Sequence, residues 1–385
     1  MIPIPFDYDT LRVVWWALLG VLLIGLAVMD GFDMGVAFLN PILGRTDSER
    51  RVILNTVGPV WDGNQVWLIT GGGAIFAAWP AVYATAFSGF YLAMFLVLVS
   101  LILRPVSFEY RNKYQGKART VWDYTLFLSG LVPPLVFGVA FGNLFLGVPF
   151  YLDEFQLPHY EDGYLLSFFN LLKPFALLTG IVSVSMLASH GAVYLAAKST
   201  GTVQQRAAKT INIGVAIWAI LFIVGGLWVG HLDGYTITSN MAANGLSNPL
   251  AKTVEVTNGV WLRNYTAYPI LYIVPLLALI GGIGTIILAK LKRYALAFIP
   301  SGLMVAGTIA TAGIALFPFL MTSSLQPSHS LTVWDASSSH LTLWLMTIAA
   351  VIFVPIVLAY TSWAFHIMRE AISEEYIKKN SDSLY

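Results

Sequence analysis

Nine predominantly apolar stretches, each about 20 residues long, divide this sequence of 385 residues. An α-helix needs about 20 such residues to cross the ~30 Å hydrocarbon layer of a membrane. The second and third stretches share the uncharged tract 63–103, which is too long for one crossing and which Trp79-Pro80 interrupts with a predicted tight turn. The sequence therefore predicts an all-α polytopic membrane protein, with spans near residues 13–38, 63–79, 80–103, 124–147, 174–197, 211–230, 267–289, 295–322 and 341–365.

Composition narrows the chemistry of this membrane protein. Only 11% of the residues are charged, against about a quarter in a soluble domain, and the formal net charge is +1. That balance leaves no basic excess for binding nucleic acid. Cysteine is absent, which excludes disulfides, thiolate metal sites, iron–sulfur clusters and thioether-linked haem. A metal or haem bound by this chain would need His, Met or carboxylate ligands.

The distribution of Lys and Arg predicts the orientation of the spans. Seventeen of these residues fall in alternate connections on one side, and the other side has only Arg12, Lys173, Lys252 and Arg263. Positive residues near span ends are retained in the cytoplasm. We therefore expect the N-terminus outside and the polar tail 369–385 in the cytoplasm. Residues 1–10 contain two aspartates and no Lys or Arg, which is not typical of a signal-peptide n-region, so we expect the first span to stay in the mature protein.

Three carboxylates lie within or at the ends of the first two spans. Asp30 and Asp33 occur late in the first span, and their i, i+3 spacing places both on one helix face. Asp62 opens the second span from the same predicted side of the membrane. A charge near the bilayer centre costs several kcal/mol, so such carboxylates indicate function by default. Desolvation and mutual repulsion would suit the three groups to take up and pass on protons.

A structural interpretation of the same residues stays open. Asp30 and Asp33 could lie in the interfacial zone or cap a kink at the neighbouring glycines, and Asp62 could be an ordinary carboxylate at a helix N-terminus. Arg104, at the end of the third span, could pair with one of these carboxylates or with a partner subunit, or simply anchor the span. We predict that Glu109 and Asp123, which flank a basic loop, are solvated.

Histidine offers little for haem ligation. His190 is the only histidine well inside a span, and axial ligands usually come as a His or Met pair on facing helices. We predict that His190 is a hydrogen-bonded packing residue, and we predict neither metal ligands nor a catalytic residue in this chain. The residues alone leave two classes of function: a proton-conducting subunit of a redox complex, or a secondary transporter that uses Asp30, Asp33 and Asp62 as a coupling-ion site. The concentration of charge in the first two spans favours the redox subunit, because transporters often have matching broken helices in both halves.

Several long segments resemble one known family. The segments are WWALLGVLLIGLAVMDGFDMG, WDGNQVWLITGGGAIFAAWP, RPVSFEYR, FGNLFLGVPF and SLTVWDASSSHLTL, in that order. They resemble subunit II of the bacterial cytochrome bd ubiquinol oxidases over nearly the whole chain. The resemblance implies two four-helix bundles plus a peripheral helix, which we divide as 1–150 for the first bundle with the acidic cluster, 151–330 for the second and 331–368 for the last helix.

The resemblance also implies partners and cofactors. A complex of this chain with subunit I and very small single-helix subunits would lie in the bacterial cytoplasmic membrane, with the N-terminus in the periplasm. It would oxidise quinol and reduce O₂ to water through two b-type haems and one haem d, which subunit I ligates mainly or wholly. A structural quinone in this chain is a further cofactor that we consider.

The family's functional carboxylates correspond to Asp30, Asp33 and Asp62, with Trp61 and Arg104 as supporting residues. Our hypothesis is that O₂ reduction takes its four protons from the cytoplasm while quinol releases protons outside. Asp62 would be the entry or relay carboxyl, Asp30 and Asp33 the adjacent carriers, and Arg104 the residue that tunes or anchors them. The reaction would then generate a proton-motive force without a pump.

Overall fold

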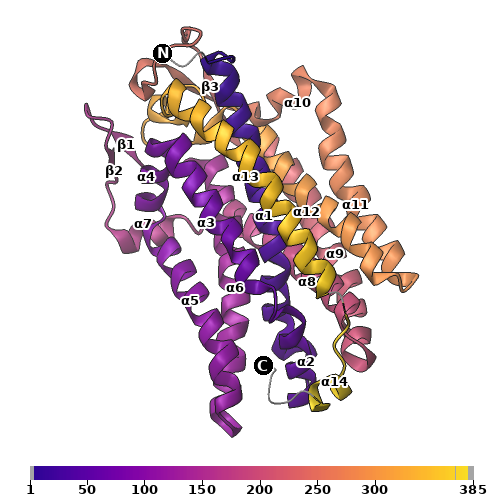
Figure 1. Ribbon diagram of the computed structural model, residues 1–385. Coiled ribbons are helices and arrows are strands. Elements are labelled where there is room, and N and C mark those ends of the chain that lie inside the picture. Colours follow the sequence, from indigo (N-terminus) through magenta and orange to yellow (C-terminus); the bar gives the residue numbers. More distant parts are fainter. Residues whose placement is uncertain (1–3, 369, 380–385) are drawn as a thin grey trace.

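The computed structural model describes residues 4–368 and 370–379, and the last part of the predicted tail lies outside the described residues. Eight helices in the described chain are long and apolar enough to cross a membrane. They run nearly side by side in one elongated bundle (Figure 1). These helices are α1 (Tyr8–Leu43), α5 (Tyr91–Lys113), α6 (Gly116–Leu146), α8 (Pro174–Lys198), α9 (Gly201–Val229), α11 (Ile273–Lys290, continuing the turn Pro269–Tyr272), α12 (Tyr294–Leu316) and α13 (His340–Ile367).

The predicted break in the tract 63–103 is confirmed. Helix α3 (Trp61–Ala78) ends just before Trp79, and α4 (Pro80–Gly89) begins at the proline. A second interruption at Phe90, which the sequence analysis did not predict, separates α4 from α5. Helix α3 is less apolar than the eight spans because its first turns contain Asp62 and Asn64. With α3 included, the predicted number of about nine spans agrees with the structure.

Several helices extend beyond their predicted apolar stretches. Helix α6 has 31 residues, or about 46 Å at 1.5 Å per residue, whereas the hydrocarbon layer needs only about 30 Å. Its polar first turns, Gly116 to Asp123, continue the same backbone hydrogen bonding past the apolar stretch. Hydropathy therefore predicted the positions of the spans correctly and underestimated the lengths of the helices.

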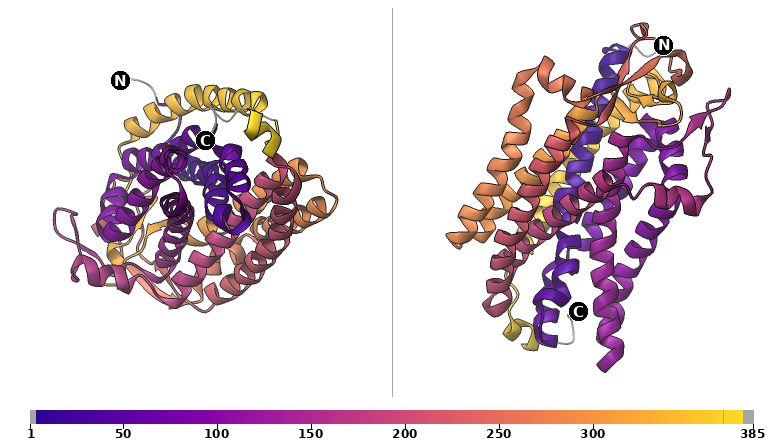
Figure 2. Two further views of the ribbon diagram at one scale, coloured as in Figure 1. Left: turned by 90° about the horizontal axis from the view of Figure 1, so that it is seen from below. Right: turned by 180° about the vertical axis from the view of Figure 1, so that it is seen from behind.

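Helix α1 passes through the centre of the bundle. It packs against α3, α6, α8 and α12 (Figure 2, left), and its close approach to α8 depends on glycine. A Cβ added at Gly35 would lie 2.2 Å from the carbonyl oxygen of Leu187, and one added at Gly191 would lie 2.7 Å from the backbone of Gly35. Gly130 of α6 similarly meets the backbone of Met34. Small residues at crossings let membrane helices approach this closely.

Helix α13 lies at the edge of the bundle. Only 6% of its most apolar window is buried, and Figures 1 and 2 show it along the outside of the other helices. This position agrees with a peripheral last helix. The division of the preceding chain into bundles at residue 150 stays a prediction.

The connections form three small antiparallel sheets rather than domains. All three lie at the end of the bundle where α1 begins, which we call the N-terminal face (Figure 1). The strands pair as β1 (Tyr151–Leu152) with β2 (Pro158–His159), β3 (Asp233–Ile237) with β4 (Val254–Asn258), and β5 (Phe319–Met321) with β6 (Leu331–Thr332). Short helices α7 (Tyr164–Asn170) and α10 (Arg263–Ala267) complete these connections.

Arg12 joins distant segments at the N-terminal face. Its guanidinium is 1% exposed and pairs with Asp9 at 2.8 Å. It also donates to the Ser337 hydroxyl at 2.8 Å, to the Ser247 hydroxyl at 3.1 Å and to the Gly245 carbonyl at 3.0 Å. The start of α1, the connection after β3 and the segment before α13 thus share one buried cation.

Helix α2 (Asp47–Val57) lies at the opposite end, the C-terminal face, together with α14 (Glu374–Lys379) (Figure 1). Glu49 completes a capping box at the start of α2 and binds Arg206 of α9 at 2.8 Å. Burial acts to raise the pKa of Glu49. Hydrogen bonds from Arg206, Thr202 and the backbone N–H groups of Arg45 and Thr46 outweigh burial and lower that pKa to about 2.

We expect Glu49 to make the stability of this face depend on pH. Its pKa is lower in the folded chain than the ordinary 4.5, so its contribution is present above about pH 4.5 and is lost as the pH falls toward 2. The E49Q variant should therefore lower the unfolding temperature at pH 7 and lower it less at pH 3. E109Q, a change at an exposed carboxylate of α5, is the control and should have little effect. Equal losses from E49Q at both pH values would contradict the prediction.

Candidate proton-transfer site

The two carboxylates of α1 lie in the interior of the bundle. Asp30 and Asp33 are 0% and 1% exposed. The glycine contacts at Gly31 and Gly35 bring this part of α1 against α8, and α3, α5 and α6 supply the other neighbours. Both carboxylates are therefore enclosed by the helices of this chain and are not solvated.

Arg104 of α5 pairs with Asp30. The Nη1 atom donates to Asp30 Oδ1 at 2.7 Å, and the side chains are 1% and 0% exposed. Of the alternatives open for Arg104, the structure therefore shows pairing with one of the carboxylates of this chain. Attraction between such charges is strong where water is excluded, but it must offset the cost of desolvating both.

Asp33 has a neutral partner. Asn64 of α3 donates from Nδ2 to Asp33 Oδ2 at 2.7 Å, and Asn64 is 2% exposed. Sequence analysis did not select Asn64, although it lies two residues after Asp62 in the polar start of the second span. The cost of burying an amide in a membrane is the signal that would have found it.

Asp62 does not join this buried group by a contact. Its side chain is exposed, and within the described part of the chain it makes no hydrogen bond or ion pair. Trp61, the first residue of α3, stacks on Phe108 of α5 with ring centroids 5.6 Å apart. The structure thus brings Asp30, Asp33 and Arg104 together and leaves Asp62 on the surface of α3.

Four polar atoms of the buried group have no hydrogen-bond partner among the described residues. They are Asp30 Oδ2, Asp33 Oδ1, and Nε and Nη2 of Arg104. Buried polar atoms in native proteins are nearly always satisfied by protein or by ordered water. The group therefore has hydrogen-bonding capacity that no described side chain uses.

The prediction that Asp123 is solvated is wrong. Asp123 of α6 is 1% exposed and accepts from Arg111 and Arg50 at 2.6 Å each. Arg111 also reaches Asp47, which Arg119 binds at 2.9 Å. The basic loop folds back onto its own carboxylates, so charge neutralisation replaces hydration. Glu109, by contrast, has an exposed side chain as predicted.

His190 is a hydrogen-bonded packing residue, as the sequence predicts. Its Nε2 lies 2.9 Å from the Val28 carbonyl, and its Nδ1 lies 2.9 Å from the Ser301 hydroxyl. Both ring nitrogens are therefore occupied. The other five histidines lie in connections or at the ends of α13, and the described residues contain no group of three or more His, Cys, Asp and Glu that could hold a metal ion.

Another buried ion pair lies outside the predicted site. Lys252 and Asp335 are both 1% exposed, and their charged atoms are 2.9 Å apart. Asp335 also accepts from the backbone N–H and the hydroxyl of Thr332. The sequence did not predict this pair, because a Lys and an Asp more than 80 residues apart give no local signal of pairing.

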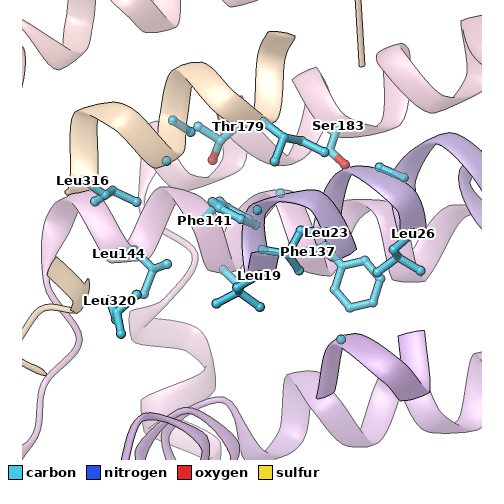
Figure 3. Close-up of a pocket in the computed structure, with 18 of the residues that line it drawn as sticks. Leu19, Leu23, Leu26, Phe137, Phe141, Leu144, Thr179, Ser183, Leu316 and Leu320 are labelled. Carbon is cyan, nitrogen blue, oxygen red and sulfur yellow. The ribbon is translucent and has the colours of Figure 1, made fainter. Parts of the chain in front are cut away.

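A large apolar cavity runs alongside α1. Its volume is about 1970 Å³. Figure 3 shows leucines of α1, aromatic residues of α6 and Thr179 of α8 around it. The Thr179 hydroxyl bonds a carbonyl of its own helix, so it adds little polarity to the wall.

Known protein families show which family this chain belongs to. A sequence model described as cytochrome bd terminal oxidase subunit II matches residues 11–368. The chain belongs to this family. It is 50% identical to the probable cytochrome oxidase subunit 2 of Haemophilus influenzae and 50% identical to the cytochrome bd-I ubiquinol oxidase subunit 2 of Escherichia coli K12, in each case over 98% of this chain and 100% of the relative.

More distant proteins support the same family. The cytochrome bd ubiquinol oxidase subunit 2 of Bacillus subtilis is 32% identical over 95% of this chain and 98% of its own length. A solved bd oxidase structure from Geobacillus thermodenitrificans matches with a TM-score of 0.68 at 16% identity, over 93% of this chain and 98% of that one, which establishes the shared fold. These comparisons give no support to the secondary-transporter alternative.

The buried pair Asp30–Arg104 makes a testable prediction about stability. D30N and R104L each leave one charge buried without its partner, which costs about 3–5 kcal/mol in comparable cases. The double variant D30N/R104L removes both charges and should recover most of the lost free energy of unfolding, as measured by denaturant titration. Additive losses in the double variant would show that the pair is not coupled.

An exposed pair provides the control for this cycle. Lys113 and Glu109 lie 3.9 Å apart on α5 with side chains 63% and 58% exposed. Removing either residue of this pair should cost no more than about 1 kcal/mol, because water screens the interaction.

Proposed function

We propose that this chain, as subunit II of a cytochrome bd quinol oxidase, delivers protons to the reduction of O₂ through its buried acidic group. The observation that carries the proposal is that two carboxyls, Asp30 and Asp33, are fully buried beside a single guanidinium, that of Arg104. The complex would catalyse the oxidation of two quinols by one O₂ to two quinones and two waters. Four protons are consumed at the oxygen site, and four are released from quinol.

Each residue of the group has a distinct part in this proposal. Asp62 is exposed at the start of α3 and would collect protons from the aqueous phase. Asp33 would hold a proton in the interior. Its hydrogen-bond partner is Asn64, which lies in the same turn of α3 as Asp62. Asp30 would be the adjacent carrier, and Arg104 would tune it or anchor it in place. The stacking of Trp61 on Phe108 would fix the first turn of α3, which links the exposed carboxyl to the buried one.

The proposed direction of proton uptake follows from charge. Arg50, Arg111, Arg119 and Arg206 belong to the C-terminal face, and the positive-inside rule assigns such an end to the cytoplasm. Asp62, near the start of α3, would then draw protons from the cytoplasm, while quinol would release its protons to the periplasm. The chemistry would thereby generate a proton-motive force without a pump. The N-terminus would be periplasmic and the C-terminus cytoplasmic.

The haems belong to the partner in this proposal. The occupied ring nitrogens of His190 support ligation of the two b-type haems and haem d by subunit I. When bound there, the haems supply electron transfer and O₂ activation. This chain would contribute proton delivery and support for the haem d site, and small single-helix subunits would complete the complex.

We further propose a structural quinone in the cavity beside α1. The cavity is large enough for an isoprenoid tail, and the leucines and aromatic rings around it match such a tail in polarity (Figure 3). The quinone would fill space and stabilise the packing of α1 against α6 and α8, and would have no part in turnover.

Removing the carboxyls tests proton delivery. D33N and D62N should each lower quinol oxidase turnover of the purified complex by about tenfold or more, because a positioned acid or base commonly contributes a factor of 10² or more. Haem content, measured separately by reduced-minus-oxidised spectra, should stay near normal. E109Q at the same face should retain full turnover.

Two other results would refute this role. Full turnover of D33N and D62N in an intact complex would exclude both carboxyls from the route. Loss of haem d together with loss of assembly would indicate that the residues act structurally.

The isolated chain tests the assignment of cofactors. Purified alone in detergent, it should contain no stoichiometric haem, because in this proposal subunit I supplies the axial ligands. It should retain quinone that organic extraction recovers. Stoichiometric haem would overturn the assignment to subunit I. If quinone is absent both from the isolated chain and from this subunit in the complex, the proposal of a structural quinone is wrong.

A further inference from the structure

Asn64 is a buried polar group that the proposed proton route does not itself explain. It lies in the first turns of α3, where its backbone N–H bonds the Val60 carbonyl at 3.1 Å. Its side chain is 2% exposed and reaches across to α1. An amide neither donates an acid proton nor carries charge, so its role must lie in what it does to Asp33.

The charges around Asp33 favour the neutral acid. The Asn64 amide is its only hydrogen-bond partner in the described chain, and the nearest guanidinium, Arg104, is committed to Asp30. A buried ionised carboxylate with one neutral donor pays a large desolvation penalty, whereas a protonated carboxyl needs no counter-charge. One cation and two buried carboxyls reach neutrality when Asp33 binds one proton.

The geometry also distinguishes the two oxygens of Asp33. The Asn64 Nδ2 donates to Oδ2 at 2.7 Å, so Oδ2 must act as acceptor. In a protonated carboxyl the carbonyl oxygen is the stronger acceptor, and the hydroxyl is on the other oxygen. The hydroxyl is then Oδ1, which has no partner among the described residues.

We propose that Asn64 is a positioning residue that holds the acid proton of Asp33 on Oδ1 by occupying Oδ2. This inference rests on the proposed function in that Asp33 is the proton carrier. With Oδ2 occupied, Asp33 offers its proton only from the free oxygen. Asp33 can then donate its proton from one side only, the side of Oδ1. Which side this is depends on the first turn of α3, which holds both Asn64 and Asp62.

Infrared spectroscopy of the whole complex tests this inference. A protonated Asp33 gives a carboxylic C=O stretching band, which is identified by its loss in D33N. In N64L the C=O loses its hydrogen-bond donor, so we expect the band to move to higher wavenumber. Turnover should fall about tenfold while haem content stays normal, and N64A provides the same comparison if the leucine variant does not assemble.

N143L is the matched control. Asn143 is a buried amide of α6 that donates to the Val139 and Leu171 carbonyls and has no contact with the acidic group. Its replacement should leave the Asp33 band unmoved even if stability falls. An unmoved band in the Asn64 variants, or no band in the unmodified complex, would overturn the inference. Full turnover of D33N would refute proton delivery through Asp33 without altering the spectroscopic result.

Discussion

One guanidinium for two carboxyls is the constraint on which the interior of this protein depends. Arg104 compensates Asp30 and leaves Asp33 to a neutral amide, so the three side chains cannot all be charged without a net charge in the bundle. Helices α1, α3 and α5 must therefore stay in register, because each supplies one part of the arrangement. A slip of one turn in any of them would place a charge against apolar side chains.

The close packing of α1 against its neighbours holds these helices in register. Gly35 and Gly191 allow backbone contact between α1 and α8, and Gly130 does the same for α6, so main-chain contacts fix the position of α1. The apolar cavity lies along the same helix, where large side chains leave space instead of filling it. Tight packing around the charged group thus coexists with loose packing along the rest of α1.

Much of the fold could be predicted from the sequence, whereas less of the site could be. Apolar stretches of fixed length located the spans, because the membrane imposes both length and polarity. The cost of a buried charge identified Asp30 and Asp33. Pairing could not be predicted in the same way: Asp123 was expected in water and lies between Arg50 and Arg111, and Lys252 meets Asp335 across more than 80 residues. Asn64 was not predicted, because an amide indicates a site only when it is buried, and its burial is known only from the structure.

The position of Arg12 bears on how this protein is made. Its guanidinium is enclosed by groups from residues 245–247 and by Ser337, which is 325 residues later in the chain. At a synthesis rate of about 5–20 residues per second, those partners emerge on the order of half a minute after α1. The first helix is therefore inserted with a cation whose contacts within that helix are Asp9 and the ring of Tyr8. Completion of the N-terminal face is a late event in biogenesis, and the ribosome must nearly finish the chain before its first span is fully packed.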